Sequence, residues 1–193
     1  MIISIIGNKG DGKTLFMTKC LVDYKTQENY IYSNYKLSKI KHNILNVNML
    51  QDFQNNNKNL ENTLIGIDEA HIFLDSRNFM SKKNKTIGYF LLQSRKRKIK
   101  CFLTFQKINQ IDIRLRQNTS FFVFCNSYEI VGQKLVKLIE GEPLFDEKNV
   151  IIIYDIWKTD KINNFEFVGK NCFYAKDYYN YYDTNEIINF LGD

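Results

Sequence analysis

The feature that most constrains this chain is a glycine-rich segment close to its first residue. Residues 7–14 read Gly-Asn-Lys-Gly-Asp-Gly-Lys-Thr, a complete G-x-x-x-x-G-K-[ST] phosphate-binding pattern. The mostly apolar run 2–6 precedes this loop, and residues 15–20 suit a helix. Because the loop stands between a predicted strand and a predicted helix, as its chemistry requires, it predicts a nucleotide-binding site at the end of a sheet.

The chemistry of such a loop explains its spacing. Its three glycines let the backbone wrap closely around a polyphosphate, since positive φ costs glycine little, and the helix N-terminus adds positive potential. We expect Lys13 to reach the β- and γ-phosphates of ATP and Thr14 to ligate Mg²⁺. The alternative is a glycine-rich turn without a ligand. The predicted nucleotide contacts are Gly7, Asn8, Lys9, Gly10, Asp11, Gly12, Lys13 and Thr14, with Lys9 as a solvated charge.

A second acidic motif would complete such a site. Residues 63–69 read Thr-Leu-Ile-Gly-Ile-Asp-Glu, as a buried parallel strand that ends in two acids would. We expect Asp68 to hold Mg²⁺ largely through a bound water, and Glu69 to polarise the attacking water as the base. The alternative is a strand that ends in a solvated acidic turn. His71 either takes part in coupling or is structural.

Further apolar runs predict the rest of an α/β fold. Residues 101–106 read as a strand that ends in Gln106, which is placed to sense the γ-phosphate or the attacking water, or is simply a polar strand end. Other strands are expected at residues 30–35, 121–125 and 150–154, and a helix at residues 129–139. Alternating strands and helices imply a mostly parallel central sheet flanked by helices.

Length and composition favour one domain. The chain has 193 residues and a single proline, so we expect one domain over 1–193, with a core to about residue 155 and an aromatic-rich extension over 156–193. The four cysteines lack metal-ligand spacing and are expected to be buried, reduced thiols. No signal peptide precedes the loop, and no apolar run approaches the ~20 residues that span a bilayer. A cytosolic or intravirion location follows.

Charge points to a polyanionic partner. The net charge is +6, and residues 82–100 contain eight lysines and arginines without an acidic residue. This segment favours contact with nucleic acid, whereas the alternative is a solvated helix face. The candidates for contact with DNA or with another subunit are Arg95, Lys96, Arg97 and Lys98, of which the two arginines are expected in the helix before the 101–106 strand.

Two more arginines are candidate functional residues. Charge that develops on a transferring phosphoryl group favours an arginine, often from a neighbouring subunit, and Arg114 and Arg116 are the candidates for this role. Either could instead pair with a surface acid.

The C-terminal tyrosines could stack on single-stranded nucleic acid or serve as packing residues. They are Tyr174, Tyr178, Tyr179, Tyr181 and Tyr182.

The order of these parts resembles a known group of proteins. After the loop come Ile-Tyr-Ser-Asn-Tyr near residue 33, Leu-Ile-Gly-Ile-Asp-Glu-Ala-His, Ser-Arg-Lys-Arg-Lys, Leu-Thr-Phe-Gln and Gln-Ile-Asp-Ile-Arg-Leu-Arg-Gln-Asn-Thr. Over residues 1–125 this order is similar to the FtsK–HerA superfamily of P-loop ATPases. The closest likeness is to Zot-like (zonula occludens toxin-type) domains and small viral genome-packaging ATPases.

The resemblance implies a RecA-like P-loop NTPase that hydrolyses ATP with Mg²⁺ and translocates DNA, most plausibly double-stranded, as a viral packaging motor. It also implies a pentameric or hexameric ring, a capsid or membrane protein as a further partner, and a location in the host cytoplasm or with the virion. Two alternatives stay open. One is a Zot-like ATPase for filamentous virion assembly or secretion, and the other is a kinase or nucleotide-binding scaffold of the same fold.

Overall fold

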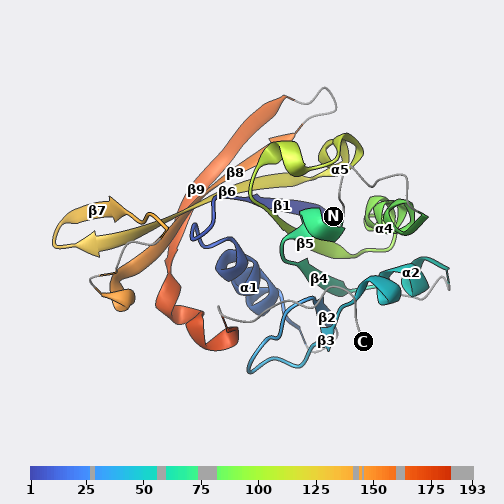
Figure 1. Cartoon of the computed structure of the whole chain (residues 1–193), viewed down its shortest axis with the longest axis horizontal. Coiled ribbons are helices and arrows are strands. Elements are labelled where there is room, and N and C mark those ends of the chain that lie inside the picture. The colour runs from blue at the N-terminus through green and yellow to red at the C-terminus, as the bar shows by residue number, and fades with distance from the viewer. Residues whose placement is uncertain are drawn as a thin grey trace.

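A single sheet forms the centre of the molecule. The computed structural model describes residues 1–26, 29–55, 60–73, 82–140, 144, 146–159 and 164–183. The strand order is β3-β2-β4-β5-β1-β6-β8-β9, and β7 pairs with β6 alone (Figure 1). The strands are β1 (Ile2–Ile6), β2 (Tyr30–Ser33), β3 (Asn43–Ile44), β4 (Thr63–Ile67), β5 (Lys100–Phe105), β6 (Phe121–Val131), β7 (Lys134–Lys137), β8 (Val150–Thr159) and β9 (Phe165–Tyr174).

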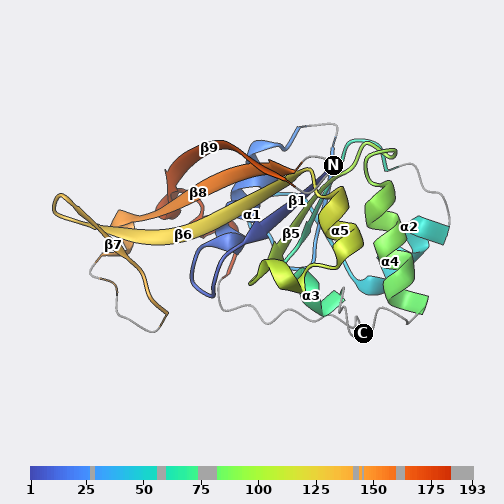
Figure 2. The same ribbon diagram turned by 90° about the horizontal axis from the view of Figure 1, so that it is seen from above.

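The sheet has a parallel part and an antiparallel part. Strands β3 to β6 of this order are parallel, whereas β7 and β8 pair antiparallel with β6, and β9 with β8. Strand β6 pairs with β1 only over its first residues and then continues past the end of β1, so the β6–β7 hairpin projects from the body (Figure 2). The predicted α/β fold with a mostly parallel central sheet is confirmed.

Helices cover both faces of the sheet. They are α1 (Lys13–Asp23), α2 (Val47–Asn55), α3 (Ala70–Phe73), α4 (Lys82–Gln93) and α5 (Ile113–Asn118). Alternate residues of a strand point to opposite faces, and β5 illustrates this. Cys101, Leu103 and Phe105 pack in the core on the side of α2, α4 and α5, whereas Phe102 packs with α1 (Figure 1). The N-terminus of α1 is thereby held at the carboxyl end of the parallel strands.

The helix predicted at residues 129–139 is wrong. Strand β6 runs to Val131, a turn at Gly132 and Gln133 follows, and β7 returns with Val131 opposite Lys134. Gly132 has φ of +61°, which a two-residue hairpin turn requires and glycine supplies without strain. The apolar residues in this segment have helical spacing, but the turn at Gly132 reverses the chain, so the segment forms a hairpin instead of a helix.

The remaining expectations have separate outcomes. The core was expected to end near residue 155, which lies inside β8, a strand that pairs with β9 along its length; the division of the chain stays a prediction. The basic residues 95–98 follow α4 in a turn instead of lying in the helix. The cysteines are free, and Cys101 and Cys125 are buried, but Cys172 is exposed. Within the described ranges, no helix is long and apolar enough to cross a membrane.

Candidate nucleotide site

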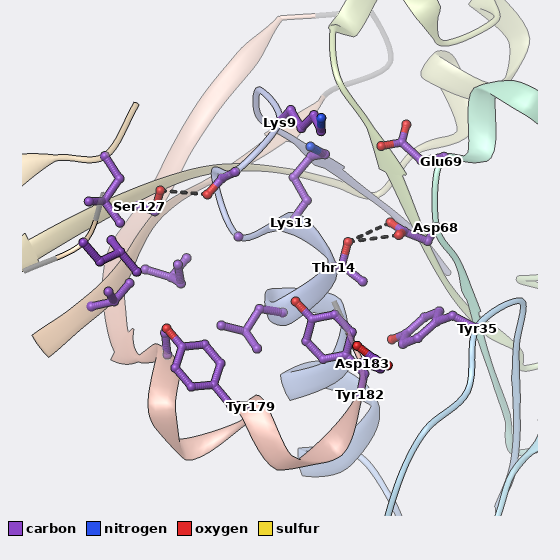
Figure 3. Close-up of a pocket in the computed structure, with 18 residues that line it drawn as sticks. Lys9, Lys13, Thr14, Tyr35, Asp68, Glu69, Ser127, Tyr179, Tyr182 and Asp183 are labelled. Carbon is purple, nitrogen blue, oxygen red and sulfur yellow. Dashed lines mark hydrogen bonds between the residues drawn. The ribbon is translucent and has the colours of Figure 1, made fainter. Parts of the chain in front are cut away.

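A cavity of about 420 Å³ lies where the glycine-rich loop meets the ends of β4, β6 and β8. One end is polar and is formed by the loop with the two predicted acids, Asp68 and Glu69 (Figure 3). The volume is within the ~300–1,000 Å³ typical of small-molecule sites. Of the predicted loop contacts, five line the cavity: Lys9, Gly10, Gly12, Lys13 and Thr14. Five of the eight predicted loop contacts and both predicted acids therefore line one cavity.

The remaining loop residues hold the loop in shape. The Asn8 N–H donates to the buried Asp11 carboxylate at 2.6 Å, so this carboxylate points into the loop. A Cβ on Gly7 would come within 2.9 Å of the Cys125 carbonyl oxygen of β6. Lys13 Nζ donates to the Asn8 carbonyl at 2.8 Å and thus lies over the loop. Gly7, Asn8 and Asp11 do not line the cavity, and their contact with nucleotide stays a prediction.

Lys9 lies at the outer rim of the cavity. Its ammonium pairs with the Glu140 carboxylate at 2.6 Å, and both side chains are more than half exposed. This agrees with the interpretation of Lys9 as a solvated loop charge. An ion pair so exposed contributes little to stability.

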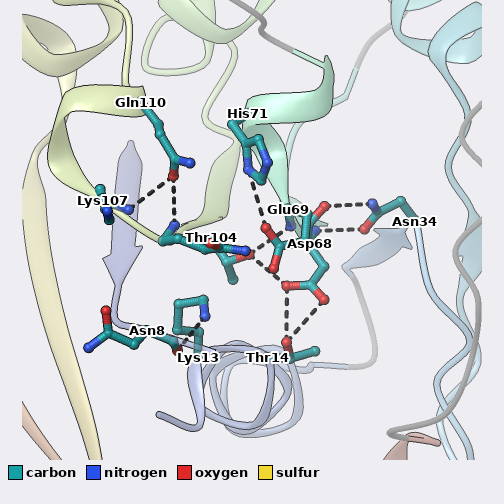
Figure 4. A network of polar contacts seen from close by, with 11 residues as sticks. Asn8, Lys13, Thr14, Asn34, Asp68, Glu69, His71, Thr104, Lys107 and Gln110 are labelled. Carbon is teal, nitrogen blue, oxygen red and sulfur yellow. Dashed lines mark hydrogen bonds and ion pairs between the residues drawn. The ribbon is translucent and has the colours of Figure 1, made fainter. Parts of the chain in front are cut away.

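Asp68 stands at the centre of a polar network (Figure 4). Thr14 Oγ1 donates toward its carboxylate oxygens at 3.0 Å each, and Thr104 Oγ1 donates to Oδ1 at 2.6 Å. Burial raises the pKa of Asp68, although the hydrogen bonds from the two threonines oppose the shift. A buried carboxylate beside a hydroxyl is a set of hard oxygen donors, and Mg²⁺ takes one or two carboxylates together with phosphate oxygens and water. These residues therefore fit Mg²⁺ on a bound nucleotide.

Within the part of the chain that the structure describes, no protein-only metal cage competes with this assignment. Among the described residues, no three His, Cys, Asp or Glu side chains gather closely enough to hold a metal ion. The Thr14 and Asp68 pair would need ligand oxygens to complete the coordination of Mg²⁺. The pair is thus suited to a metal that arrives with phosphate.

Glu69 is held in an unusual backbone conformation. Its φ is +49°, the left-handed region that non-glycine residues seldom adopt and that often marks functional sites. Its N–H donates to Thr104 Oγ1 at 2.8 Å, which ties it to Asp68 through one shared threonine. His71 Nδ1 lies 3.2 Å from Glu69 Oε2 but without hydrogen-bond geometry. The carboxylate lines the cavity on the side of the two loop lysines (Figure 3).

Asn34, which follows β2, is a positioning residue that was not singled out from the sequence. Its side-chain amide donates to the Asp68 carbonyl at 2.9 Å and accepts from the Asp68 N–H at 2.7 Å. These two bonds extend the pairing of β2 with β4 by one residue, through a side chain (Figure 4). Ser127 on β6 was missed as well, and its hydroxyl donates to the Gly10 carbonyl at 2.8 Å. Asn34 lies in the Ile-Tyr-Ser-Asn-Tyr segment quoted above, which could have drawn attention to it, whereas Ser127 lies in no motif and only the fold identifies it.

Replacing Asn34 with alanine should lower both stability and turnover. The change leaves the N–H and C=O of Asp68 unpaired in a buried place, and each such group costs about 1–3 kcal/mol. We expect the free energy of unfolding, measured by urea titration, to fall by about 2–6 kcal/mol. Asn118→Ala is the matched control, because Asn118 is an exposed amide that bonds one carbonyl. Equal losses in both variants would contradict the role of Asn34.

Gln106 lies beside the start of the loop, but among the described residues neither it nor the two later arginines line the cavity. Gln106 follows β5, which pairs with β1 up to the loop, and its N–H donates to Gln110 Oε1. The Arg116 guanidinium donates to the carbonyls of Ile108 and Ile111 and is partly buried. Arg114 is exposed on α5. The sensor role of Gln106 and the trans-acting arginine stay predictions.

The basic candidates at 95–98 lie at the opposite end of the strands and differ from one another. Arg97 donates to the Phe53 carbonyl and to Gln93 Oε1, and it lies over the Phe90 ring, so it joins α2 to α4. Lys98 pairs with Glu61 at 3.3 Å. Arg95 and Lys96 are exposed and line a second cavity of about 580 Å³ together with Lys158. The side chains of Lys82, Lys83 and Lys85 lie outside the described residues.

Comparison with solved structures agrees with the fold. The N-terminal domain of the zonular occludens toxin from Neisseria meningitidis matches with a TM-score of 0.59 and 20% identity, over 94% of this chain and 98% of that one. The genome-packaging NTPase B204 from Sulfolobus turreted icosahedral virus 2, in complex with ATPγS, matches with a TM-score of 0.54 and 13% identity, over 87% of this chain and 96% of that one. No protein-family model and no curated protein sequence matches the chain.

These matches confirm the resemblance stated from the sequence. The two kinds of protein to which the motifs pointed, Zot-like domains and viral packaging ATPases, are the ones whose structures the chain resembles over nearly its whole length. At these identities the likeness establishes the fold, a P-loop NTPase fold, and leaves the activity to the residues of the site.

Proposed function

We propose that this chain is a Mg²⁺-dependent ATPase that moves DNA, as a viral genome-packaging motor does. One observation carries the proposal. The Thr14 hydroxyl of the glycine-rich loop lies 3.0 Å from the Asp68 carboxylate, and Glu69 lines the same cavity. This is the arrangement that hydrolysis of a nucleoside triphosphate needs: a phosphate cradle, a metal-binding pair and a nearby base.

The residues act in three roles. The loop N–H groups and the Lys13 ammonium hold the phosphates and neutralise their charge. Glu69 accepts a proton from the attacking water. The oxygen of this water bonds to the γ-phosphorus while the bond between the γ-phosphorus and the ADP oxygen breaks. Mg²⁺ held by Thr14 and Asp68 would offset the charge that spreads over the phosphate oxygens. Gln106, at the end of β5, reports the state of the γ-phosphate.

A neighbouring subunit completes this site in the proposed ring. Arg114 and Arg116 are both candidates for the trans-acting arginine: the Arg114 side chain is exposed, and the Arg116 guanidinium donates to carbonyls of its own chain. Five or six subunits would place each cavity at a subunit boundary. A capsid or membrane protein is the expected further partner of such a ring.

DNA contact is assigned to the exposed basic pair. Arg95 and Lys96 line the second cavity with Lys158, at the end of the sheet opposite the nucleotide. Clustered basic side chains bind the phosphate backbone of DNA without reading its sequence. Arg97 and Lys98 are instead engaged within the chain, and they are not counted among the DNA contacts.

Replacing Arg95 and Lys96 together with alanine should weaken DNA stimulation of the ATPase and leave the basal rate unchanged. The logarithm of DNA affinity falls with the logarithm of salt concentration, and loss of two phosphate contacts should make this slope shallower by about 2. DNA affinity measured by fluorescence anisotropy at several salt concentrations gives this slope. Arg97→Ala is the control, and it should lower stability more than it lowers DNA affinity. An unchanged salt slope in the double variant would remove this surface from the DNA path.

Two other functions fit parts of the same observations. The match to the zonular occludens toxin domain covers the larger share of this chain and favours, as second candidate, a Zot-like ATPase for filamentous virion assembly. A kinase of this fold would transfer phosphate to an acceptor instead of water.

Phosphate release from ATP tests the proposed activity. We expect release with Mg²⁺, none with a chelator, and a large loss in Lys13→Ala, since a charged hydrogen bond contributes about 1.5–3 kcal/mol. Release that needs an added phosphate acceptor would select the kinase. Release that a membrane partner stimulates and DNA does not would select the assembly factor.

A further inference from the structure

The nucleotide cavity has a second, apolar end. Away from the loop it is lined mainly by aliphatic side chains and tyrosines, together with the Asp183 carboxylate; Tyr179, Tyr182 and Asp183 lie on the lower side of Figure 3. These residues come from the start of β8, from positions between β7 and β8, and from the C-terminal segment that follows β9. They are Leu138, Leu144, Val150, Ile152, Ala175, Tyr179 and Tyr182.

The C-terminal segment crosses α1 as a strap, which we define as residues 175–183. It contains two short 3-10 turns, Ala175–Asp177 and Tyr179–Tyr181. The Tyr178 hydroxyl donates to Asp23 at the end of α1 at 3.1 Å. The Tyr181 carbonyl accepts from the Ser38 N–H at 2.6 Å. The strap is thus anchored at the far end of α1 and beside the segment that follows β2.

The anchored strap fixes two tyrosines at the cavity. Tyr182 forms an isolated β-bridge with Leu37, and its ring meets the buried Tyr35 ring edge to face at 6.0 Å. Burial raises the pKa of Tyr182. Tyr179 is half-buried, and its ring stands on the strap with its hydroxyl toward the cavity (Figure 3). Because the anchors lie on both sides of Tyr179, its position is set before any ligand arrives.

These rings point at the nucleotide cavity and not at the outer surface. The role considered from the sequence, stacking on single-stranded nucleic acid, requires rings on an open surface. Among the five C-terminal tyrosines, Tyr174 is exposed at 44% and meets that need, whereas Tyr179 and Tyr182 face the loop that holds phosphate. An aromatic ring and aliphatic side chains at one cavity end, with a phosphate cradle at the other, match the two ends of a nucleotide.

We infer that the strap and the residue that directly follows β7 form the nucleoside-binding part of the site, in which Tyr179 and Leu138 hold the base of the bound nucleotide. The inference rests on the proposed nucleotide site at the loop. It names the substrate class: a nucleoside triphosphate, bound at both ends, in contrast to an inorganic polyphosphate. It also gives the C-terminal segment a role in the ATPase site.

Two ligands separate the two ends of the cavity. ATPγS carries a base, and inorganic tripolyphosphate carries only the phosphates, so calorimetric titration of each, with Mg²⁺, measures the base contribution directly. Tyr179→Ala should weaken ATPγS binding by roughly 5- to 150-fold, the range for loss of one base–aromatic stack, and leave tripolyphosphate affinity unchanged. Tyr179→Phe should restore ATPγS binding. Tyr174→Ala, which removes an exposed tyrosine of β9, should change neither ligand.

Each result decides one point. Equal weakening of both ligands in Tyr179→Ala, or no weakening of either, would overturn the nucleoside subsite. Lys13→Ala should weaken both ligands, because it acts on the phosphates. Failure of both ligands to bind the unmodified protein would instead overturn the proposed nucleotide site itself. Thermal unfolding of Tyr179→Ala checks that the strap variant is folded, and Leu138→Ala, which removes the other proposed contact with the base, serves in its place if it is not.

Discussion

Replacing Glu69 with glutamine should slow ATP hydrolysis by about 10²–10⁴-fold, the usual contribution of a general base. Glutamine keeps the size and polarity of the side chain but cannot accept the proton of the attacking water. The Glu69 N–H bond to Thr104 belongs to the backbone and survives the change. ATP affinity should therefore stay close to that of the unmodified protein. Single-turnover phosphate release, measured beside equilibrium binding of ATPγS, separates the two quantities.

Glu61→Gln is the matched control for this variant. Glu61 is a partly exposed glutamate that pairs with Lys98 at the other end of the strands, so the same change there should leave hydrolysis intact. Hydrolysis at the normal rate in Glu69→Gln would show that Glu69 is not the base. Loss of ATPγS binding in that variant would show that the side chain supports the loop instead.

The second large effect is expected at Gly12. This residue caps the N-terminus of α1 with φ of +79°, and a Cβ built there would lie 2.4 Å from Ile152 Cδ1 and 2.9 Å from Cγ1. Ile152 is buried at 2% exposure, so its side chain cannot turn aside without repacking. Left-handed backbone costs an alanine about 1–2 kcal/mol, and overpacking adds about 1–3 kcal/mol. Gly12→Ala should lower the free energy of unfolding by about 2–5 kcal/mol and abolish nucleotide binding.

Gly10→Ala isolates the backbone part of this effect. Gly10 has nearly the same φ, +84°, but a Cβ there would meet nothing within 4 Å. Its alanine variant should lose only the left-handed cost of about 1–2 kcal/mol. Urea unfolding of both variants gives the difference, which measures how tightly the loop packs on β8. Equal losses in the free energy of unfolding of the two variants would mean that the contact between position 12 and Ile152 does not affect stability.

The parallel half of the fold and the polar end of the site could be predicted from the sequence. A motif such as Gly-x-x-x-x-Gly-Lys-Thr fixes residue types at a fixed spacing, and the rule that parallel strands end at one edge brings Asp68 beside Thr14. The prediction needed no knowledge of distant contacts. It therefore placed Lys13, Thr14, Asp68 and Glu69 in one cavity, as the structure has them.

The antiparallel half could not be predicted in this way. The segment 129–139 satisfies both helical and strand spacing, and only the positive φ at Gly132 distinguishes a hairpin. The position of Tyr179 at the cavity depends on contacts between segments more than 100 residues apart, such as that of Tyr178 with Asp23. Asn34 acts through two bonds to one distant backbone unit. No local pattern records such contacts.

The central claim is that ATP hydrolysis at this site is coupled to DNA. The most direct test is the steady-state ATPase rate against added double-stranded and single-stranded DNA, with native mass measured on the same samples. The account predicts a rate that rises with DNA, more with double-stranded than with single-stranded, in a protein whose mass is that of five or six chains. A rate that stays flat across the DNA titration would contradict it.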